Sequence, residues 1–202
     1  MIDRQTLLDI ARQAMGTRKG LLTREAGYLL HHGQRTAEIA LHLCEQLDSH
    51  GEIDGEILHA AALFHDIGKG IDPHAETGAE LARMLLSDVY SPQECERIAT
   101  LIEQHNKRGQ SNVSLAVDIL QDADILDHFG AQAVWLCFLY NGYTEKGPHG
   151  ALAYFESDEN ARYQQRSRAA LNFDYSRVVL DQRLAIEQSF FTRFREEIDG
   201  AL

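Results

Sequence analysis

An imidazole and a carboxylate stand next to each other at the end of one apolar run of this sequence. The run is Ala61-Ala62-Leu63-Phe64-His65-Asp66-Ile67-Gly68-Lys69, and its spacing is typical of a helix. Both polar groups are costly to bury unless a partner compensates them. A metal ion is the simplest partner, because imidazole nitrogen and carboxylate oxygen are ordinary ligands of divalent ions. The run therefore predicts a metal centre, provided that other segments supply further ligands.

Other segments place further metal-binding residue types on the apolar faces of predicted helices. These are a helix over about 24–47, a helix that begins with Pro73 at its first position, a helix that follows Ser91-Pro92, and a helix from about Val113. Together with the first run they supply His32, His65, Asp66, His74, His105 and Asp124. Each side chain alone is more often a hydrogen-bonded core residue than a ligand. Several ionisable groups in one core without a cation would, however, each lose about 1–3 kcal/mol. The convergence favours a metal centre, in which His31 is the main alternative to His32.

The two oxygens of Asp66 leave the number of ions open. One oxygen could bind a first ion and the other a second ion, with the ions about 3.5–4 Å apart. His74 and His105 could serve that second ion. A mixed set of imidazoles and carboxylates favours Mn, Fe, Co, Ni or Zn over calcium, and Mg would fit with waters as additional ligands. We expect one divalent ion and leave the second site open.

The elements that must position these residues all have helical periodicity, so we expect an all-α protein. We expect a single domain over 1–202, with a motif core at about 24–140 and a C-terminal helical extension at 141–202. Three features of the second half are predicted: the helix from about Val113 continues into Trp135–Tyr140, residues 141–158 form a loop, and the chain is helical again from about Glu159. The last helix has the predicted inward stripe Ile186, Phe190, Phe194 and Ile198, which could close the core or form a homodimer face.

Composition and charge limit the partners. The net charge of −12 and the pI of about 5.2 mean that the average surface repels nucleic acid and anionic lipid. The longest apolar run, Ala133–Tyr140, is too short to span a bilayer. The three cysteines lie in helical, hydrophobic contexts without a C-x-x-C pair, which is typical of reduced thiols. We therefore expect a cytoplasmic protein that binds neither nucleic acid nor membrane.

The order of these motifs resembles the HD-domain metal-dependent phosphohydrolase superfamily. The resemblance covers about Leu29 to Asp127: His32 with Arg35, then His65-Asp66-Ile67-Gly68-Lys69, then Gln121-Asp122-Ala123-Asp124. The later segments look like small stand-alone bacterial HD hydrolases. The resemblance implies a helical bundle and a divalent ion bound by His32, His65, Asp66 and Asp124. His74 and His105 look like the extra histidines of members with two ions. The Gly-Tyr-Pro signature of cyclic-di-GMP phosphodiesterases is absent from the sequence, which argues against that substrate.

The resulting hypothesis is hydrolysis of a nucleotide or another small phosphate ester by metal-activated water. Asp66 would act as ligand and proton acceptor, while Lys69 and Arg35 would neutralise phosphate oxygens. Ordinary surface salt bridges are an equal interpretation of the two cations, and a solvated loop is the simpler one for Lys107 and Arg108. Two alternatives remain open: a di-iron oxygenase, because some HD-domain proteins hold such a centre, and a non-catalytic nucleotide-binding regulatory module.

Overall fold

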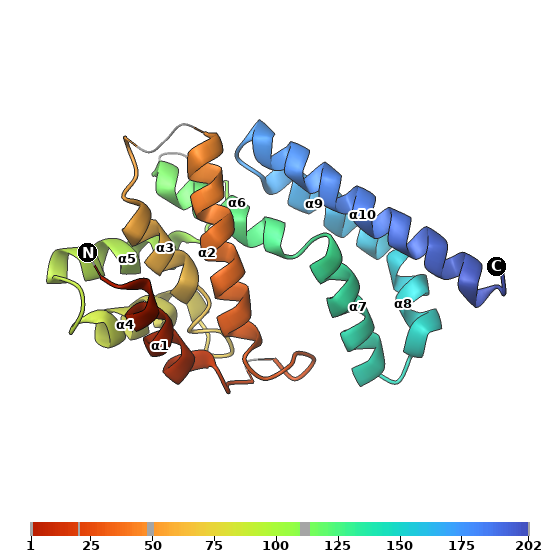
Figure 1. Cartoon of the computed structure of the whole chain (residues 1–202), viewed down its shortest axis with the longest axis horizontal. Helices are drawn as coiled ribbons and strands as arrows, with labels where there is room; N and C mark the ends of the chain where they lie inside the picture. The colour runs from red at the N-terminus through yellow and green to blue at the C-terminus, as the bar shows by residue number, and fades with distance from the viewer. Residues whose placement is uncertain (1, 20, 48–50, 110–113, 202) are drawn as a thin grey trace. The chain divides into compact units, whose positions relative to one another are not determined.

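Every regular element in the described part of the chain is an α-helix (Figure 1). The computed structural model describes residues 2–19, 21–47, 51–109 and 114–201. Their helices are α1 Arg4–Met15, α2 Tyr28–Gln46, α3 Gly55–Phe64, α4 His74–Leu86, α5 Pro92–Gln104, α6 Leu115–Asp127, α7 Ala131–Tyr143, α8 Gly147–Phe155, α9 Asp158–Ala170 and α10 Asp174–Ile198. The predicted all-α class is confirmed. None of these helices is both long and apolar enough to cross a bilayer.

Side-chain caps begin α3 and α5. Asp54 accepts hydrogen bonds from the first turn of α3, and Ser91 forms a reciprocal capping box with Glu94 at the start of α5. Such caps stabilise a helix by about 1 kcal/mol each. At α4 the prediction was wrong by one position: Pro73 is the N-cap residue, and the helix begins at His74.

The chain divides into two compact units, Met1–Asp124 and Ile125–Leu202. We call them the N-terminal and the C-terminal unit and describe each by itself. The boundary falls inside α6 and inside the predicted motif core, so the single domain over 1–202 stays a prediction.

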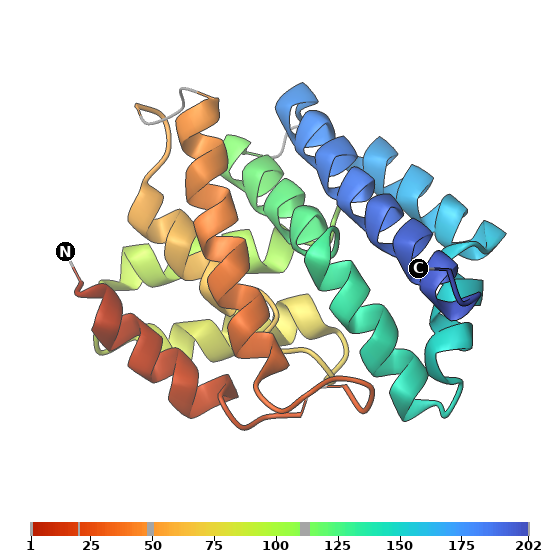
Figure 2. The same ribbon diagram turned by 45° about the vertical axis from the view of Figure 1, so that its right-hand side comes forward.

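The N-terminal unit is built around α3. Seven of the ten residues of this helix are buried, because α2 packs along one side and α5 along another (Figure 2). A helix that is apolar on all sides is stable only inside a core. Helix α4 packs on α5 and adds the buried residues Ala75, Ala79 and Ala82. The end of α3 therefore delivers His65 and Asp66 into the middle of the unit.

The C-terminal unit differs from the sequence predictions at two places. Helices α6 and α7 are separate, because Gly130 takes a φ of 80° that breaks the predicted continuous helix. Val113, the predicted start of that helix, lies outside the described residues. The predicted loop over 141–158 contains α8, whose Ala151 and Leu152 pack with Phe191 in the core of this unit.

The first half of the predicted inward stripe of α10 is shifted by one residue. Phe191 is buried, whereas Ile186 and Phe190 have 53% and 41% of their surface exposed. Phe194 and Ile198 are partly buried against the same core, as predicted. The stripe therefore contributes to the core of this unit in part, and a homodimer face stays a prediction.

Candidate metal centre

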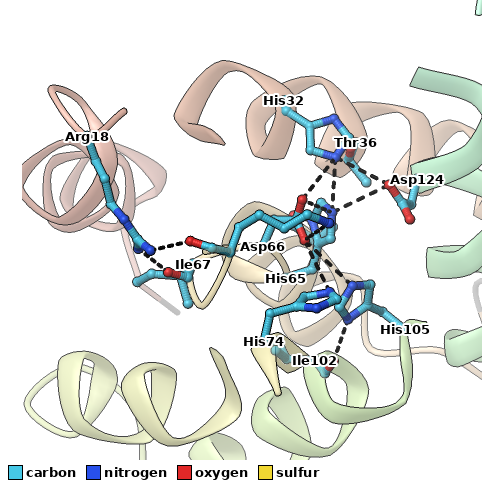
Figure 3. Close-up of polar contacts among 12 residues, drawn as sticks. Arg18, His32, Thr36, His65, Asp66, Ile67, His74, Ile102, His105 and Asp124 are labelled. Atoms are coloured by element: carbon cyan, nitrogen blue, oxygen red, sulfur yellow. Dashed lines mark hydrogen bonds and ion pairs between the residues drawn. The ribbon is translucent and has the colours of Figure 1, made fainter. Parts of the chain in front are cut away.

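The predicted metal ligands converge at one point of the N-terminal unit (Figure 3). They come from five helices: His32 from α2, His65 and Asp66 from the end of α3, His74 from the start of α4, His105 from the end of α5, and Asp124 from α6. His32 is fully buried, whereas its neighbour His31 is exposed and faces Gln34. The structure thus brings together all six predicted ligands and leaves His31 outside.

A first group of ligand atoms has the separations that one ion requires. The Nε2 atoms of His32 and His65 lie 3.1 Å apart, and Oδ1 of Asp124 lies 3.3 Å from the first and 3.6 Å from the second. Oδ2 of Asp66 lies 3.9 Å from both nitrogens. Two ligands of one ion with bonds of about 2.1 Å lie about 3.0–4.2 Å apart. All five distances fall in this range.

The other oxygen of Asp66 faces a second group. Oδ1 lies 3.8 Å from Nε2 of His74 and 3.7 Å from Nε2 of His105. Nε2 of His74 is buried and has no hydrogen-bond partner. A buried nitrogen without a partner costs about 1–3 kcal/mol, and a cation beside it would remove that cost. Asp66 is therefore placed to serve two neighbouring cation sites, one with each oxygen.

Backbone carbonyls fix the orientation of two of the imidazoles. Nδ1 of His65 donates to the carbonyl of Ala62 at 2.8 Å, and Nδ1 of His105 donates to the carbonyl of Ile102 at 2.6 Å. A carbonyl can only accept, so Nδ1 of each ring carries a proton and Nε2 is the nitrogen that faces the site. This is the tautomer and orientation that a metal-binding histidine needs.

A close contact between α2 and α3 sets the distance between His32 and His65. A Cβ atom at Gly33 would lie 2.2 Å from the carbonyl oxygen of Leu63. Only glycine allows this approach. Gly33 follows His32 directly in the sequence, and Leu63 precedes His65 by two residues. The glycine therefore sets how closely the two imidazoles approach.

Electrostatics keep Asp66 and His105 in the protonation states that bind metal. Burial would raise the pKa of Asp66, but the charges of His65 and Lys69 outweigh it and lower the pKa to about 2. Burial, with a contribution from His65, lowers the pKa of His105 to about 4. Near neutral pH Asp66 is thus ionised and His105 is neutral, which are the forms that bind divalent ions.

Two cations contact the outer oxygens of the carboxylates, by which we mean the oxygens that do not face His32 and His65. The ammonium of Lys69 lies 3.3 Å from Oδ1 of Asp66, and the guanidinium of Arg108 donates to Oδ2 of Asp124 at 2.7 Å. Arg35 is half-buried on α2, one turn after His32. Lys69 thus lies beside Asp66, and Arg108, for which a solvated loop was the simpler interpretation, contacts Asp124.

Arg18 is a supporting residue that sequence analysis missed. Its guanidinium donates to the carbonyls of Ile67 and Lys69, and so fixes the turn that follows Asp66 (Figure 3). Arg18 lies between α1 and α2, where nothing in the local pattern marks it. Its role depends on a contact 49 residues away along the chain.

Comparisons with known proteins agree with this fold. Residues 29–128 match the HD domain family, and that range contains every predicted site residue. The uncharacterized protein YpgQ of Bacillus subtilis is 25% identical over 202 aligned residues, which cover 90% of each chain.

Solved structures of such proteins superpose along nearly the whole chain. The structure of Bacillus subtilis YpgQ in complex with ADP has a TM-score of 0.65 at 20% identity and covers 96% of this chain and 98% of that one. An HD-superfamily hydrolase from Bacillus thuringiensis has a TM-score of 0.68 at 18% identity, with 97% and 96% covered. At these identities the similarity shows a common fold. The family match over residues 29–128 identifies this chain as an HD-domain protein.

Proposed function

We propose that this protein is a metal-dependent phosphohydrolase that acts on a nucleotide or another small phosphate ester. The observation that carries the proposal is the convergence of His32, His65, Asp66 and Asp124, with a cation on the outer oxygen of each carboxylate. These four residues would hold a divalent ion. Mn, Fe, Co, Ni and Zn suit the mixed ligand set, and Mg would fit if water completes its coordination.

The residues around the ion would divide the remaining work. A bound ion supplies an acidified water and polarises a phosphoryl oxygen. Lys69, whose side chain is one-third exposed, would pair with phosphoryl oxygens at the open side of Asp66. Asp66 would bind the ion and could also accept the proton of the bound water. Arg35 would neutralise further phosphate charge.

Two observations support a nucleotide as the substrate. The related protein YpgQ has been crystallised with ADP. In this chain, whose net charge is −12, the cations at the site are the local attraction for a polyphosphate. His74 and His105, with Oδ1 of Asp66, would bind a second ion when one is present.

Metal content and phosphate release test the proposal together. We would measure bound metal in the purified protein and phosphate release from ADP and a panel of other nucleotides. His65→Ala should lose the ion and the activity, while His31→Ala, which changes the exposed neighbour of His32, should keep both. Full phosphate release by His65→Ala would contradict the mechanism. Two irons per chain with oxygen consumption and no phosphate release would identify an oxygenase instead.

A further inference from the structure

Arg108 donates a hydrogen bond to the outer oxygen of Asp124, a predicted metal ligand. Its guanidinium lies 2.7 Å from Oδ2 of Asp124, while Oδ1 of the same carboxylate faces His32 and His65. The side chain of Arg108 is 35% exposed, whereas that of Asp124 is 12% exposed. The contact therefore joins a buried carboxylate to a cation that reaches solvent.

The backbone next to Arg108 is fixed to the same helix as Asp124. Gln121, buried on α6, donates from Nε2 to the carbonyl of Gln104 at 3.0 Å and to that of Lys107 at 3.4 Å. These bonds hold the segment after α5 against α6, one turn before Asp124. The hydrogen bonds from Gln121 thus hold the backbone next to Arg108 close to the site.

The adjacent Lys107 has different partners. Its ammonium lies 3.0 Å from Glu103 and 3.6 Å from Glu76, and neither residue belongs to the metal centre. Two neighbouring cations therefore have separate roles: Lys107 pairs with surface carboxylates, and Arg108 pairs with Asp124. This difference makes Lys107 a control for any experiment on Arg108.

The charge balance of the centre indicates what happens to Arg108 when an ion binds. Without an ion, Lys69 pairs with Asp66 and Arg108 pairs with Asp124. A divalent ion among the same carboxylates would add two positive charges beside the guanidinium, and like charges at this range repel. A phosphate group arriving with the ion would offer Arg108 a new anionic partner, which a guanidinium can bind through two parallel hydrogen bonds.

We propose that Arg108 binds the substrate phosphate and is held in position by Asp124 until the ion and the phosphate arrive. This inference rests on the proposed function and extends it, because it makes ion binding and phosphate binding favour each other through one residue. The competing role is positioning: Arg108 would stay on Oδ2 and orient Asp124 toward the ion. The two roles differ in the sign of the effect that removal of Arg108 has on the affinity for the ion alone.

The test measures Mn²⁺ binding to the full chain, freed of metal beforehand, with and without saturating inorganic phosphate. Free Mn²⁺ is followed by its electron paramagnetic resonance signal. Arg108→Gln is compared with Lys107→Gln, which removes the same charge one residue away, and circular dichroism verifies that both variants are folded. Binding linkage is reciprocal, so the factor by which phosphate tightens Mn²⁺ is also the factor by which Mn²⁺ tightens phosphate.

We expect Arg108→Gln to bind Mn²⁺ alone at least as tightly as the wild type. The factor by which phosphate tightens Mn²⁺ binding should be about tenfold smaller in this variant. Lys107→Gln should keep the wild-type coupling. Weaker Mn²⁺ binding by Arg108→Gln together with unchanged coupling would overturn the inference in favour of the positioning role.

Failure of the proposed function would give a different result. Coupling through Arg108 in a protein that releases phosphate from no nucleotide would sustain this inference and contradict the hydrolase. Phosphate release by a wild-type protein without any coupling would do the reverse. Absence of Mn²⁺ binding to the wild type would overturn both.

Discussion

Replacing Gly33 by alanine should separate the stability of the fold from the geometry of the metal centre. The added Cβ would lie 2.2 Å from the carbonyl oxygen of Leu63, and ordinary contact begins at 3.4 Å. Helices α2 and α3 must therefore move apart by about 1 Å, since the contact is with backbone that cannot rotate away. The movement acts directly between His32 and His65.

The expected loss of stability is modest, because two effects oppose each other. Overpacking of this kind costs about 1–3 kcal/mol, while replacement of a helical glycine by alanine gains about 1 kcal/mol. The free energy of unfolding should therefore fall by about 0–2 kcal/mol. Metal binding has much less tolerance, because ligand distances must hold to about 0.2 Å. A 1 Å increase in the 3.1 Å separation of the two Nε2 atoms should weaken Mn²⁺ binding by about 10- to 100-fold.

Denaturant unfolding and Mn²⁺ titration of the same variant measure the two quantities. Gly142→Ala is the matched control, because a Cβ at this helical glycine in α7 would meet nothing within 4 Å. The control should keep its metal affinity and gain up to about 1 kcal/mol of stability. Wild-type Mn²⁺ affinity in Gly33→Ala would refute the reasoning, since the contact at Leu63 would then not determine where His32 lies.

Three further changes have defined outcomes. Burial, only partly opposed by the hydrogen bond from Gly130, raises the pKa of Glu187 from 4.5 to about 7. The folded state therefore holds a proton between about pH 4.5 and 7 that the unfolded state releases, and stability falls by up to about 3 kcal/mol as pH rises through that window. The lowered pKa of His105 acts in the opposite direction over part of this window and is common to both proteins, so the difference in urea-unfolding free energy between the wild type and Glu187→Gln should show this fall. Arg18→Gln should lower the free energy of unfolding by about 1–3 kcal/mol and weaken Mn²⁺ binding, whereas Arg12→Gln, on an exposed ion pair, should change stability by less than about 0.5 kcal/mol. Added Mn²⁺ should raise the melting temperature of the wild type in a concentration-dependent way, and a His65→Ala protein should show no such shift.

The helices that sequence analysis predicted best are those with a strong local signal. Helix α3 has a continuous apolar run behind Asp54, and α5 has its capping box, so both boundaries follow from neighbouring residues. Helix α8 was missed because Gly147, Pro148 and Gly150 are typical of a loop. Its stability comes from Ala151 and Leu152, which pack against residues far along the chain.

Adjacent aromatic residues explain the shifted stripe of α10. Phe190 and Phe191 are both large and apolar, and helical periodicity permits either to face the core. Phe191 does so by stacking on Phe155 at 4.2 Å between ring centroids. The same rotation buries Glu187, whose partner is the backbone N–H of Gly130 at the break between α6 and α7. A tertiary contact thus determined a phase that the local pattern left ambiguous.

The candidate ligands could be predicted because their residue types conflict with their surroundings. A histidine or aspartate on an apolar face is conspicuous in the sequence, and convergence from several helices follows from burying those faces together. Arg18 and Arg108 carry no such conflict, since an arginine in a polar connection is ordinary. Their roles arise from long-range hydrogen bonds to Ile67 and to Asp124, which only the folded chain brings into reach.

Two buried carboxylates show how the surroundings separate a cation-binding group from a structural one. Asp66 and Glu187 are 7% and 4% exposed, so both lose most of their hydration, and burial raises the pKa of each. At Asp66 the charges of His65 and Lys69 reverse the shift and hold the group ionised. At Glu187 a single backbone N–H does not, and the pKa stays raised at about 7. A buried carboxylate must be neutralised by a proton or by a cation. At Glu187 a proton suffices, whereas at Asp66 four imidazole nitrogens within 4 Å make a divalent ion the better partner. In the metal-free form the buried Nε2 of His74 beside this carboxylate has no hydrogen-bond partner, and ion binding should remove that cost and stabilise the N-terminal unit.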